Sequence, residues 1–368
     1  MRASRRLGLG TLVLAGLVAL PGRAEAPAPF GFTPGTAPID EANPPNPASC
    51  EPCHEAIYED WRQSRHRVSW SNDLMIAGFV AEPLPFCVNC HAPFVGQRAE
   101  ILANLDFYRS LHPASGTTQL PARQPERTAS YGIHCATCHV RGDTMLAPEA
   151  SGFSPHQTRA VPEMRAGTFC IDCHEFAVPV TRNGHTELTD APMQQTGTEW
   201  TAWRRAGGDQ TCQDCHMPDG RHVFRGAHDR TWLQASVSVT QGAGVFTLQS
   251  VDVGHAFPTG DLFRHLTLDV ERDGSWQTVH WIGRRFEKDA EQVRRVVSDT
   301  SLQPGEVRRV EVDGHFDRWR LVYHYGAEHD EIRGLLDPDA IRFPLAEGPA
   351  TGPDDHSTAG GRRPGTGG

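Results

Sequence analysis

The sequence predicts an α+β protein with two domains in series: a mainly helical and irregular domain over 50–231, followed by an antiparallel β-sandwich over 232–346. Three observations support this division. The chain has 368 residues, which is enough for two domains of ordinary size. Every cysteine lies in the first of these segments, and short runs of alternating apolar and polar residues begin only in the second.

The composition excludes several classes of protein. Hydrophobic residues make up 38% of the chain and charged residues 22%, which fits neither a membrane bundle nor a disordered protein. The formal net charge is −10. Because binding to phosphates requires a basic face, this charge argues against a nucleic-acid partner.

The first 26 residues have the layout of a secretory signal peptide. Three arginines occur among the first six residues, and an apolar stretch runs from Leu7 to Leu20. This stretch is shorter than the roughly 20 residues that a membrane-spanning helix needs. We therefore expect a signal peptide over 1–26 that is cleaved after Ala24 or Ala26, with an uncleaved anchor as the alternative.

All ten cysteines belong to five copies of one pattern, in which two cysteines three positions apart are followed directly by a histidine. This pattern, C-x-x-C-H, is the attachment signature of c-type haem. Two thiols at this spacing reach the two vinyl groups of one porphyrin, and the next histidine places its imidazole on the iron. The sequence therefore predicts five covalently bound haem c groups. In chain order, motifs 1 to 5 are Cys50, Cys53 and His54; Cys87, Cys90 and His91; Cys135, Cys138 and His139; Cys170, Cys173 and His174; and Cys212, Cys215 and His216.

Three other uses of cysteine explain this pattern less well. Five disulfides in an exported chain would require neither the fixed spacing nor the five histidines. Zinc sites built from paired cysteines do not require a histidine after every pair. Redox motifs of the thioredoxin type do not occur in fives.

The five motifs follow one another at irregular intervals within the first domain. Five haems leave too little polypeptide there for an ordinary apolar core, so we expect the porphyrins to form most of the core. Closely packed haems pass electrons from one to the next. This arrangement indicates electron transfer.

The rest of the chain divides by local pattern. Segment 27–49 is rich in proline and reads as an extended linker. Short helices are expected near the motifs, at Glu55–Ser69 and Gly197–Arg205, with little strand before residue 230. Segment 347–368 is rich in glycine and proline and is expected to be a disordered tail.

Short alternating runs after residue 232 predict the strands of an antiparallel sandwich. Two of these runs flank Asp273 and Gly274, a pair typical of a tight hairpin turn. The predicted strands are Ala235–Thr240, Val245–Leu248, His265–Val270, Trp276–Val279, Val307–Val312 and Trp319–Tyr325.

The residues around the motifs are more specific than the motifs themselves. They are Tyr58, Trp61, Ser64 and His66 after motif 1; Glu199 and Trp200 before motif 5; Met217, Pro218 and the run His222–Asp229 after it; and Gly254–Gly260 in the second domain. Together they resemble the multihaem cytochromes c related to the tetrahaem cytochrome of ammonia oxidisers and to hydroxylamine oxidoreductase. The similarity is greatest to a branch in which a C-terminal β-domain carries a GH-x-x-PTG segment, and it covers roughly residues 48 to 275.

This resemblance implies an exported electron carrier, although some relatives act on small nitrogen or sulfur compounds at a haem with an open iron. The related pentahaem nitrite reductases have a lysine in place of one motif histidine. Here all five motifs end in histidine, and Lys288, the one lysine, lies far beyond them. The hydroxylamine-oxidising relatives cross-link a tyrosine to the haem, but no tyrosine here has a distinguishing context. The sequence therefore favours a carrier over an enzyme, and it assigns no catalytic residue.

Second axial ligands must come from the histidines outside the motifs. In relatives, a histidine at the place of His66 binds a different haem from the one attached beside it. Because His222 and His228 follow motif 5 closely, they are further candidates. His255 lies in the GH-x-x-PTG segment and is either an iron ligand or a turn histidine bonded to backbone. His134 and His156 are weaker candidates, and no methionine has a context that predicts a His/Met haem.

We therefore expect an exported pentahaem cytochrome c that relays electrons between periplasmic or membrane redox proteins through mostly bis-histidine haems. Periplasmic placement is expected, with the cell surface and the exterior left open, as is the oligomeric state. Bis-histidine ligation keeps reduction potentials low, since Met/His coordination raises them. Two alternatives remain: an oxidoreductase for hydroxylamine or for nitrogen or sulfur oxyanions with one open haem iron, and a haem subunit of a larger assembly or filament.

Overall fold

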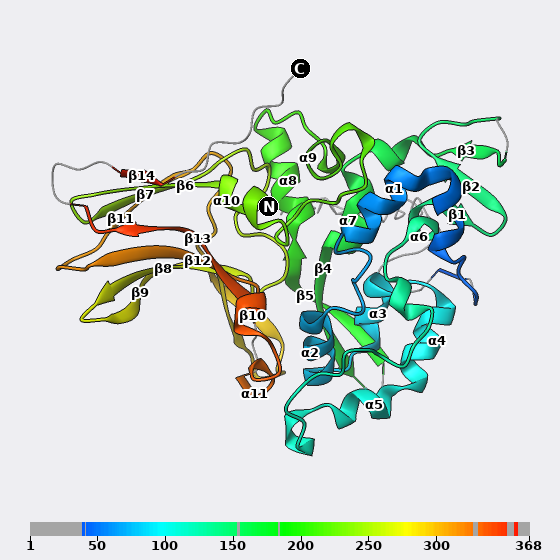
Figure 1. Ribbon diagram of the computed structural model, residues 1–368, viewed down its shortest axis with the longest axis horizontal. Helices are drawn as coiled ribbons and strands as arrows, with labels where there is room; N and C mark the ends of the chain where they lie inside the picture. Colours follow the sequence, from blue (N-terminus) through cyan, green and yellow to red (C-terminus); the bar gives the residue numbers. More distant parts are fainter. Residues whose placement is uncertain are drawn as a thin grey trace, which may run out of the picture.

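The computed structural model describes residues 39–40, 42–152, 155–182, 185–326, 330–351 and 357–359. The predicted signal peptide, most of the predicted linker and most of the predicted tail lie outside these residues. Figure 1 shows a helical domain beside a two-layered β-domain, which confirms the predicted α+β, multidomain class. Within the described residues, no helix is both long enough and apolar enough to cross a membrane.

The first domain is built from short helices. They are α1 (Glu51–Gln63), α2 (Asp73–Ala81), α3 (Pro85–His91), α4 (Val95–Ala103), α5 (Leu105–Ser110), α6 (Cys135–His139), α7 (Thr168–His174), α8 (Thr196–Arg205) and α9 (Cys212–His216). The helix expected to continue to Ser69 ends at Gln63, because Ser64 adopts an extended backbone. His66 therefore lies in the turn after α1 and not on the helix itself.

Helices α2 to α5 contain more ordinary core than the sequence led us to expect. Trp70, Phe79 and Tyr108 are fully buried and meet edge to face, with ring centres 5.0–5.7 Å apart. The Trp70 indole donates to the Tyr108 hydroxyl, which donates to the Glu126 carboxylate over 2.8 Å. Haem thus does not provide the whole interior of this domain, since a stretch between motifs packs on its own side chains.

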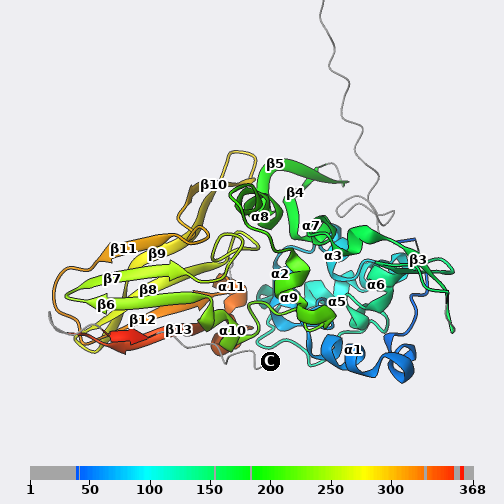
Figure 2. The same ribbon diagram turned by 90° about the horizontal axis from the view of Figure 1, so that it is seen from above.

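A long hairpin was not expected in the first domain. It consists of β4 (Glu175–Arg182), which begins directly after His174, and β5 (His185–Gln195). Three shorter strands, β1 (Val140–Arg141), β2 (Thr144–Ala147) and β3 (Thr158–Ala160), form a separate small sheet. In both views the hairpin lies where the two domains meet (Figure 1, Figure 2). Arg295 of the β-domain forms an ion pair with Asp190 of β5 there.

The second domain is a sandwich of two antiparallel sheets. One sheet has the order β10-β9-β8-β12-β13 and the other the order β11-β7-β6-β14. The strands are β6 (Val237–Gly242), β7 (Val245–Ser250), β8 (His265–Arg272), β9 (Ser275–Lys288), β10 (Arg294–Asp299), β11 (Val307–Glu311), β12 (Arg318–His324), β13 (Arg342–Pro349) and β14 (Ser357–Ala359). The short helix α10 (Arg230–Ala235) leads into β6. Alternating side chains of both sheets form the core between the two layers.

The β8–β9 hairpin has the predicted turn. Asp273 and Gly274 both have positive φ, at 52° and 73°, as a two-residue type I′ turn requires. Arg272 pairs with Ser275 across it. In β8, Leu266, Leu268 and Val270 point into the core between the sheets, and Thr267 and Asp269, on the opposite face, are buried as well.

The end of the second domain differs from the prediction in two ways. Strand β13 continues to Pro349, past the expected boundary at residue 346, because its last residues still pair with β12. In addition, the segment between β12 and β13 returns to the first domain. This segment contains α11 (Asp330–Arg333) and α12 (Pro338–Ile341), and its Ile332 and Leu336 join the apolar cluster of α2.

Candidate haem sites

The five motifs occupy short helices, and the motif histidine usually ends its helix. His91, His139, His174 and His216 are the last residues of α3, α6, α7 and α9, and His54 interrupts α1 with non-helical φ and ψ. Within one helical turn, positions three apart lie on the same face. Both thiols of a motif can therefore reach the same side of one porphyrin. None of the ten cysteines forms a disulfide bond.

Four of the motif histidines face a second histidine across a gap of constant width. Metal–imidazole bonds are about 2 Å long and the ring centre lies about 1 Å further out, so two imidazoles on one iron have centres about 6 Å apart. The structure has this spacing four times. The distances between ring centres are 6.2 Å for His54 and His156, 6.4 Å for His174 and His66, 6.1 Å for His139 and His222, and 6.3 Å for His216 and His255.

Backbone carbonyls orient several of these rings through Nδ1. The Nδ1 of His139 lies 2.8 Å from the carbonyl of Leu146, and that of His255 lies 2.8 Å from the carbonyl of Ala256. A carbonyl fixes the proton on Nδ1 and leaves Nε2 available to a metal. His216 and His222 have the same kind of contact. The residues present therefore fit haem iron at these positions.

Burial favours the neutral form of six of the paired imidazoles, the form that iron ligation requires: it lowers the pKa values of His66, His139, His174, His216, His222 and His255. Burial lowers the pKa of His66 to about 3 and those of His174 and His255 to about 4. The Nδ1 atoms of His66 and His156 are also buried without a hydrogen-bond partner. An imidazole in such surroundings is favoured as a ligand over an imidazolium, because the charged form loses its hydration.

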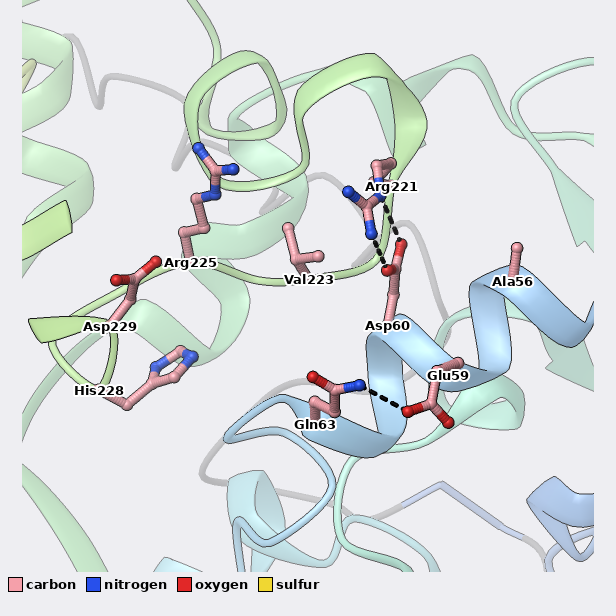
Figure 3. Close-up of a pocket in the computed structure, with 9 residues that line it drawn as sticks. All are labelled: Ala56, Glu59, Asp60, Gln63, Arg221, Val223, Arg225, His228 and Asp229. Atoms are coloured by element: carbon pink, nitrogen blue, oxygen red, sulfur yellow. Dashed lines mark hydrogen bonds and ion pairs between the residues drawn. The ribbon is translucent and has the colours of Figure 1, made fainter. Parts of the chain in front are cut away.

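Two predicted distal ligands have other surroundings. The ring of His134 stacks on Phe94 with centres 5.1 Å apart, and its Nδ1 accepts from the backbone N–H of Ala136 at the start of α6. His228 lines a pocket of about 530 Å³ between α1 and the chain after motif 5, next to the Arg221–Asp60 ion pair (Figure 3). Neither ring faces a motif histidine at the spacing of the four pairs.

His91 of motif 2 differs from the other four motif histidines. Its Nδ1 lies 2.9 Å from the carbonyl of Ser69, so its Nε2 is directed toward a metal in the same way. In the described parts of the chain, however, no imidazole stands opposite it. The charged group that acts on His91 comes from the β-domain: the carboxylate of Asp261, which opposes the lowering of its pKa by burial.

Thiols of different motifs meet in the interior. Motif 1 contacts motif 3, and motif 4 contacts both motif 2 and motif 5. In addition, Cys138 of motif 3 interacts electrostatically with Cys173 of motif 4. The neighbouring thiol pairs are Cys50 with Cys135, Cys90 with Cys173, and Cys170 with Cys212, and the neighbour raises the pKa of Cys135, Cys173 and Cys170.

The four histidines that face a motif histidine are all among the predicted distal candidates, and their role as iron ligands stays a prediction. The groups that surround them were not predicted. The carbonyls of Ser69 and Leu146 carry no signal in a sequence, because any residue provides a carbonyl. Asp261 and Arg264 closely follow the GH-x-x-PTG segment in the sequence. This closeness is the one sequence feature that could have marked them as neighbours of the candidate haem sites.

Comparisons with known proteins agree with this geometry. Residues 48–229 match a family model described as "Outer membrane cytochrome MtrC/MtrF-like, domains II/IV". The fold is similar to the crystal structure of a penta-heme cytochrome c552 from Thermochromatium tepidum, with a TM-score of 0.57 and 20% identity, over 83% of this chain and 100% of that one. No curated protein matches the chain. The comparisons support a multihaem cytochrome c with covalently bound haem.

Proposed function

We propose that this chain is an exported pentahaem cytochrome c that relays electrons between redox partners. The observation that carries the proposal is the set of four imidazole pairs, each with ring centres 6.1–6.4 Å apart and each including a motif histidine. Such a gap is too wide for ring contact and fits one iron atom. Bound haem would supply a one-electron iron couple, and the protein would set its potential through ligands, burial and nearby charge.

The ligand pairs follow from the same geometry. His54 with His156 would hold the haem of motif 1, and His139 with His222 that of motif 3. The haem of motif 4 would take His66, from the turn after α1. His255 would bind the haem of motif 5 from the β-domain, which ties the two domains together through iron.

The contacts between motif thiols support a connected relay. Because each thiol joins its porphyrin edge, motifs whose thiols touch would hold their haems edge to edge. Motif 1 would thus pass electrons to motif 3, motif 3 to motif 4, and motif 4 to motifs 2 and 5.

Export and partners are part of the same proposal. Haem attachment to C-x-x-C-H motifs, the predicted signal peptide and the similarity to an outer-membrane cytochrome domain favour the periplasm or the cell surface. The partners would be periplasmic or membrane redox proteins. The GH-x-x-PTG segment supports a place in the branch related to hydroxylamine oxidoreductase.

Haem counting and spin-state spectroscopy test this function. A pyridine haemochrome assay should give five haems per chain, and electron paramagnetic resonance should show low-spin bis-histidine iron at four of them. His66→Ala should keep all five haems, because attachment depends on the thiols, and should convert one low-spin haem to high-spin. His185→Ala, at an exposed position of β5, is the matched control. Fewer than four low-spin haems in the parent protein, or an unchanged His66→Ala spectrum, would contradict the ligand assignment.

A second function is favoured by one observation. His91 has no facing imidazole among the described residues, so the haem of motif 2 would have an open coordination position. An open iron binds small molecules, and an oxidoreductase activity on a nitrogen or sulfur compound would require one.

A further inference from the structure

We propose that Asp60 of α1 positions His222, the second ligand proposed for the haem of motif 3. The inference rests on the proposed function, because it takes His222 as an iron ligand, and it adds the residue that holds this ligand in place. Asp60 acts through His222 and is a positioning residue, not a ligand. The helix that carries motif 1 would thereby control the coordination of a haem attached at another motif.

The first argument is a three-point contact between Asp60 and the segment that carries His222. The Asp60 Oδ2 accepts from the backbone N–H of His222 and from Nε of Arg221, each over 3.2 Å. The Asp60 Oδ1 accepts from a terminal N–H of the same guanidinium, and Figure 3 shows both contacts with Arg221. A bidentate pair of this kind fixes the orientation of the two groups as well as their distance. One carboxylate thus holds two consecutive residues.

The second argument is the burial of the Asp60 carboxylate. Only 9% of the Asp60 surface is accessible, although residues 51–57 of the same helix are exposed. A buried carboxylate costs free energy unless hydrogen bonds satisfy it. Among the described residues, its donors are the guanidinium of Arg221 and the backbone N–H of His222. Displacement of His222 would therefore leave this charge without donors that it needs.

The third argument is that the chain around His222 has no regular structure to support it. Residues 221–229 contain no helix or strand. Farther along this segment, Arg225 is held by motif 5, since its backbone N–H donates to the carbonyl of His216 over 3.0 Å. At His222 itself, the backbone N–H is held by Asp60. The position of the ligand's backbone therefore depends on α1.

The imidazole of His222 is fixed separately from its backbone. Its Nδ1 lies 3.0 Å from the carbonyl of Gly220. The ring of Phe224 meets it edge to face, with centres 5.7 Å apart, and the ring of His139 lies opposite at 6.1 Å. With the backbone held by Asp60 and Nδ1 held by Gly220, Nε2 is the atom left for the iron.

The next residue of α1 holds the opposite side of the same haem site. The indole N–H of Trp61, a buried side chain, donates over 2.7 Å to the carbonyl of Ile133, which lies just before Cys135 of motif 3. Asp60 and Trp61 thus connect one helix to the chain on both sides of the motif 3 haem. Since α1 also carries His54 of motif 1, the fold of the first haem site would determine how far apart the two imidazoles of motif 3 lie.

The test uses the holoprotein and begins with His222→Ala. This variant should convert one low-spin haem to high-spin and so identify the signals of the motif 3 haem. Asp60→Ala should convert a fraction of the same haem to high-spin, because His222 loses its backbone anchor. The double variant should have the spectrum of His222→Ala alone, since Asp60 acts through that ligand. Glu59→Gln, which removes the neighbouring carboxylate of α1 in the same pocket, is the matched control and should match the parent.

Asp60→Asn gives a graded measurement and decides the matter if Asp60→Ala does not fold. The amide keeps an acceptor for the N–H of His222 but loses the charge that binds Arg221. The motif 3 haem should therefore stay low-spin. Carbon monoxide must displace His222 to bind this haem when it is reduced, and its apparent affinity there should rise about tenfold, the effect of one charge-assisted hydrogen bond.

Three outcomes would overturn the proposal, and they separate it from the proposed function. If His222→Ala leaves every spin state unchanged, the ligand pair of motif 3 is wrong, and this inference fails with it. If His222→Ala converts one haem but both Asp60 variants match the parent, the ligand pair stands and Asp60 does not position it. If Asp60→Ala adds a second high-spin haem to the His222→Ala spectrum, Asp60 acts on a different haem.

Discussion

The two domains differ in what fills their interiors. One continuous cluster of nineteen buried residues joins the two sheets of the sandwich. In the first domain, one cluster beside the motifs has only six buried residues, and the larger cluster around Trp70 combines residues of α2 to α5 with Ile332 and Leu336 from the segment between β12 and β13. The sandwich can therefore form by burial of its own apolar surface, whereas the motif region needs covalently bound haem to fill its interior.

The largest expected effect follows from withholding haem. Expression without cytochrome c maturation machinery should leave the motif region unfolded, because its motif helices are mostly five to seven residues long and are marginal alone. Limited proteolysis should then digest the first domain and leave a protected fragment that begins near residue 232. An equally protected first domain would show that haem does not provide its interior.

A cavity in the sandwich should destabilise the second domain and leave the haems of the first domain unaffected. Phe246 is fully buried between the sheets, against Phe316 and Trp319. Phe246→Ala should destabilise the sandwich by about 3–5 kcal/mol and leave the haem spectra of the folded protein unchanged. Chemical denaturation followed by tryptophan fluorescence measures this loss. Val307→Ala, on an exposed side chain of β11, should change stability little and serves as the control.

His255 is the point at which the two domains would depend on one another. His255→Ala should convert one of the low-spin haems to high-spin, and a chain ending at Arg230 should give the same spectrum. His315→Ala, at an exposed position, should leave every spin state unchanged. If the shorter chain keeps all its low-spin signals, then His255 is a turn residue and the domains are joined by protein contacts alone.

The smallest expected effect is a pH dependence at Glu199. Burial raises the pKa of this carboxyl, against the opposing effect of its hydrogen bond from Thr259. The folded protein therefore binds the proton of Glu199 more tightly than the unfolded chain does. In the unfolded chain this carboxyl has a pKa of about 4.3. The stability that the proton provides is present at low pH and is lost as the pH rises through the folded-state pKa.

Glu199→Gln imitates the protonated form and should remove this dependence. Thermal unfolding of parent and variant should agree near pH 4.5, and the variant should become relatively more stable, by about 1 kcal/mol, toward neutral pH. If the difference in stability between parent and variant stays constant over this pH range, the charged form of Glu199 does not destabilise the folded protein.

Sequence reasoning identified the parts of the molecule that depend on local pattern. The Asp273–Gly274 turn and the strands beside it follow from alternation and positive φ, which are encoded within a few residues. The β4–β5 hairpin was missed because Pro179 and Pro192 lie inside its strands, and proline normally argues against a strand. Strand β10 was missed because its six residues carry arginines, serine and aspartate that hide the alternation.

The histidine pairs illustrate a different limit. His66, His156, His222 and His255 could be named as candidates, but their partners could not. The partner of His66 is His174, more than one hundred residues away, and this depends on how the chain returns to the turn after α1. His134 directly precedes motif 3 and was a candidate for the same reason. Its stacking on Phe94 can be seen only in the structure.

The position of the motif 4 thiols beside those of three other motifs has a consequence for electron transfer through the molecule. Because the thiols of motif 4 neighbour those of motifs 2, 3 and 5, the haem of motif 2 would form a side branch, and the proposed route from motif 1 to motif 5 would bypass it. Loss of the haem of motif 2 would then reduce the number of electrons the chain stores by one. The current along the route would continue.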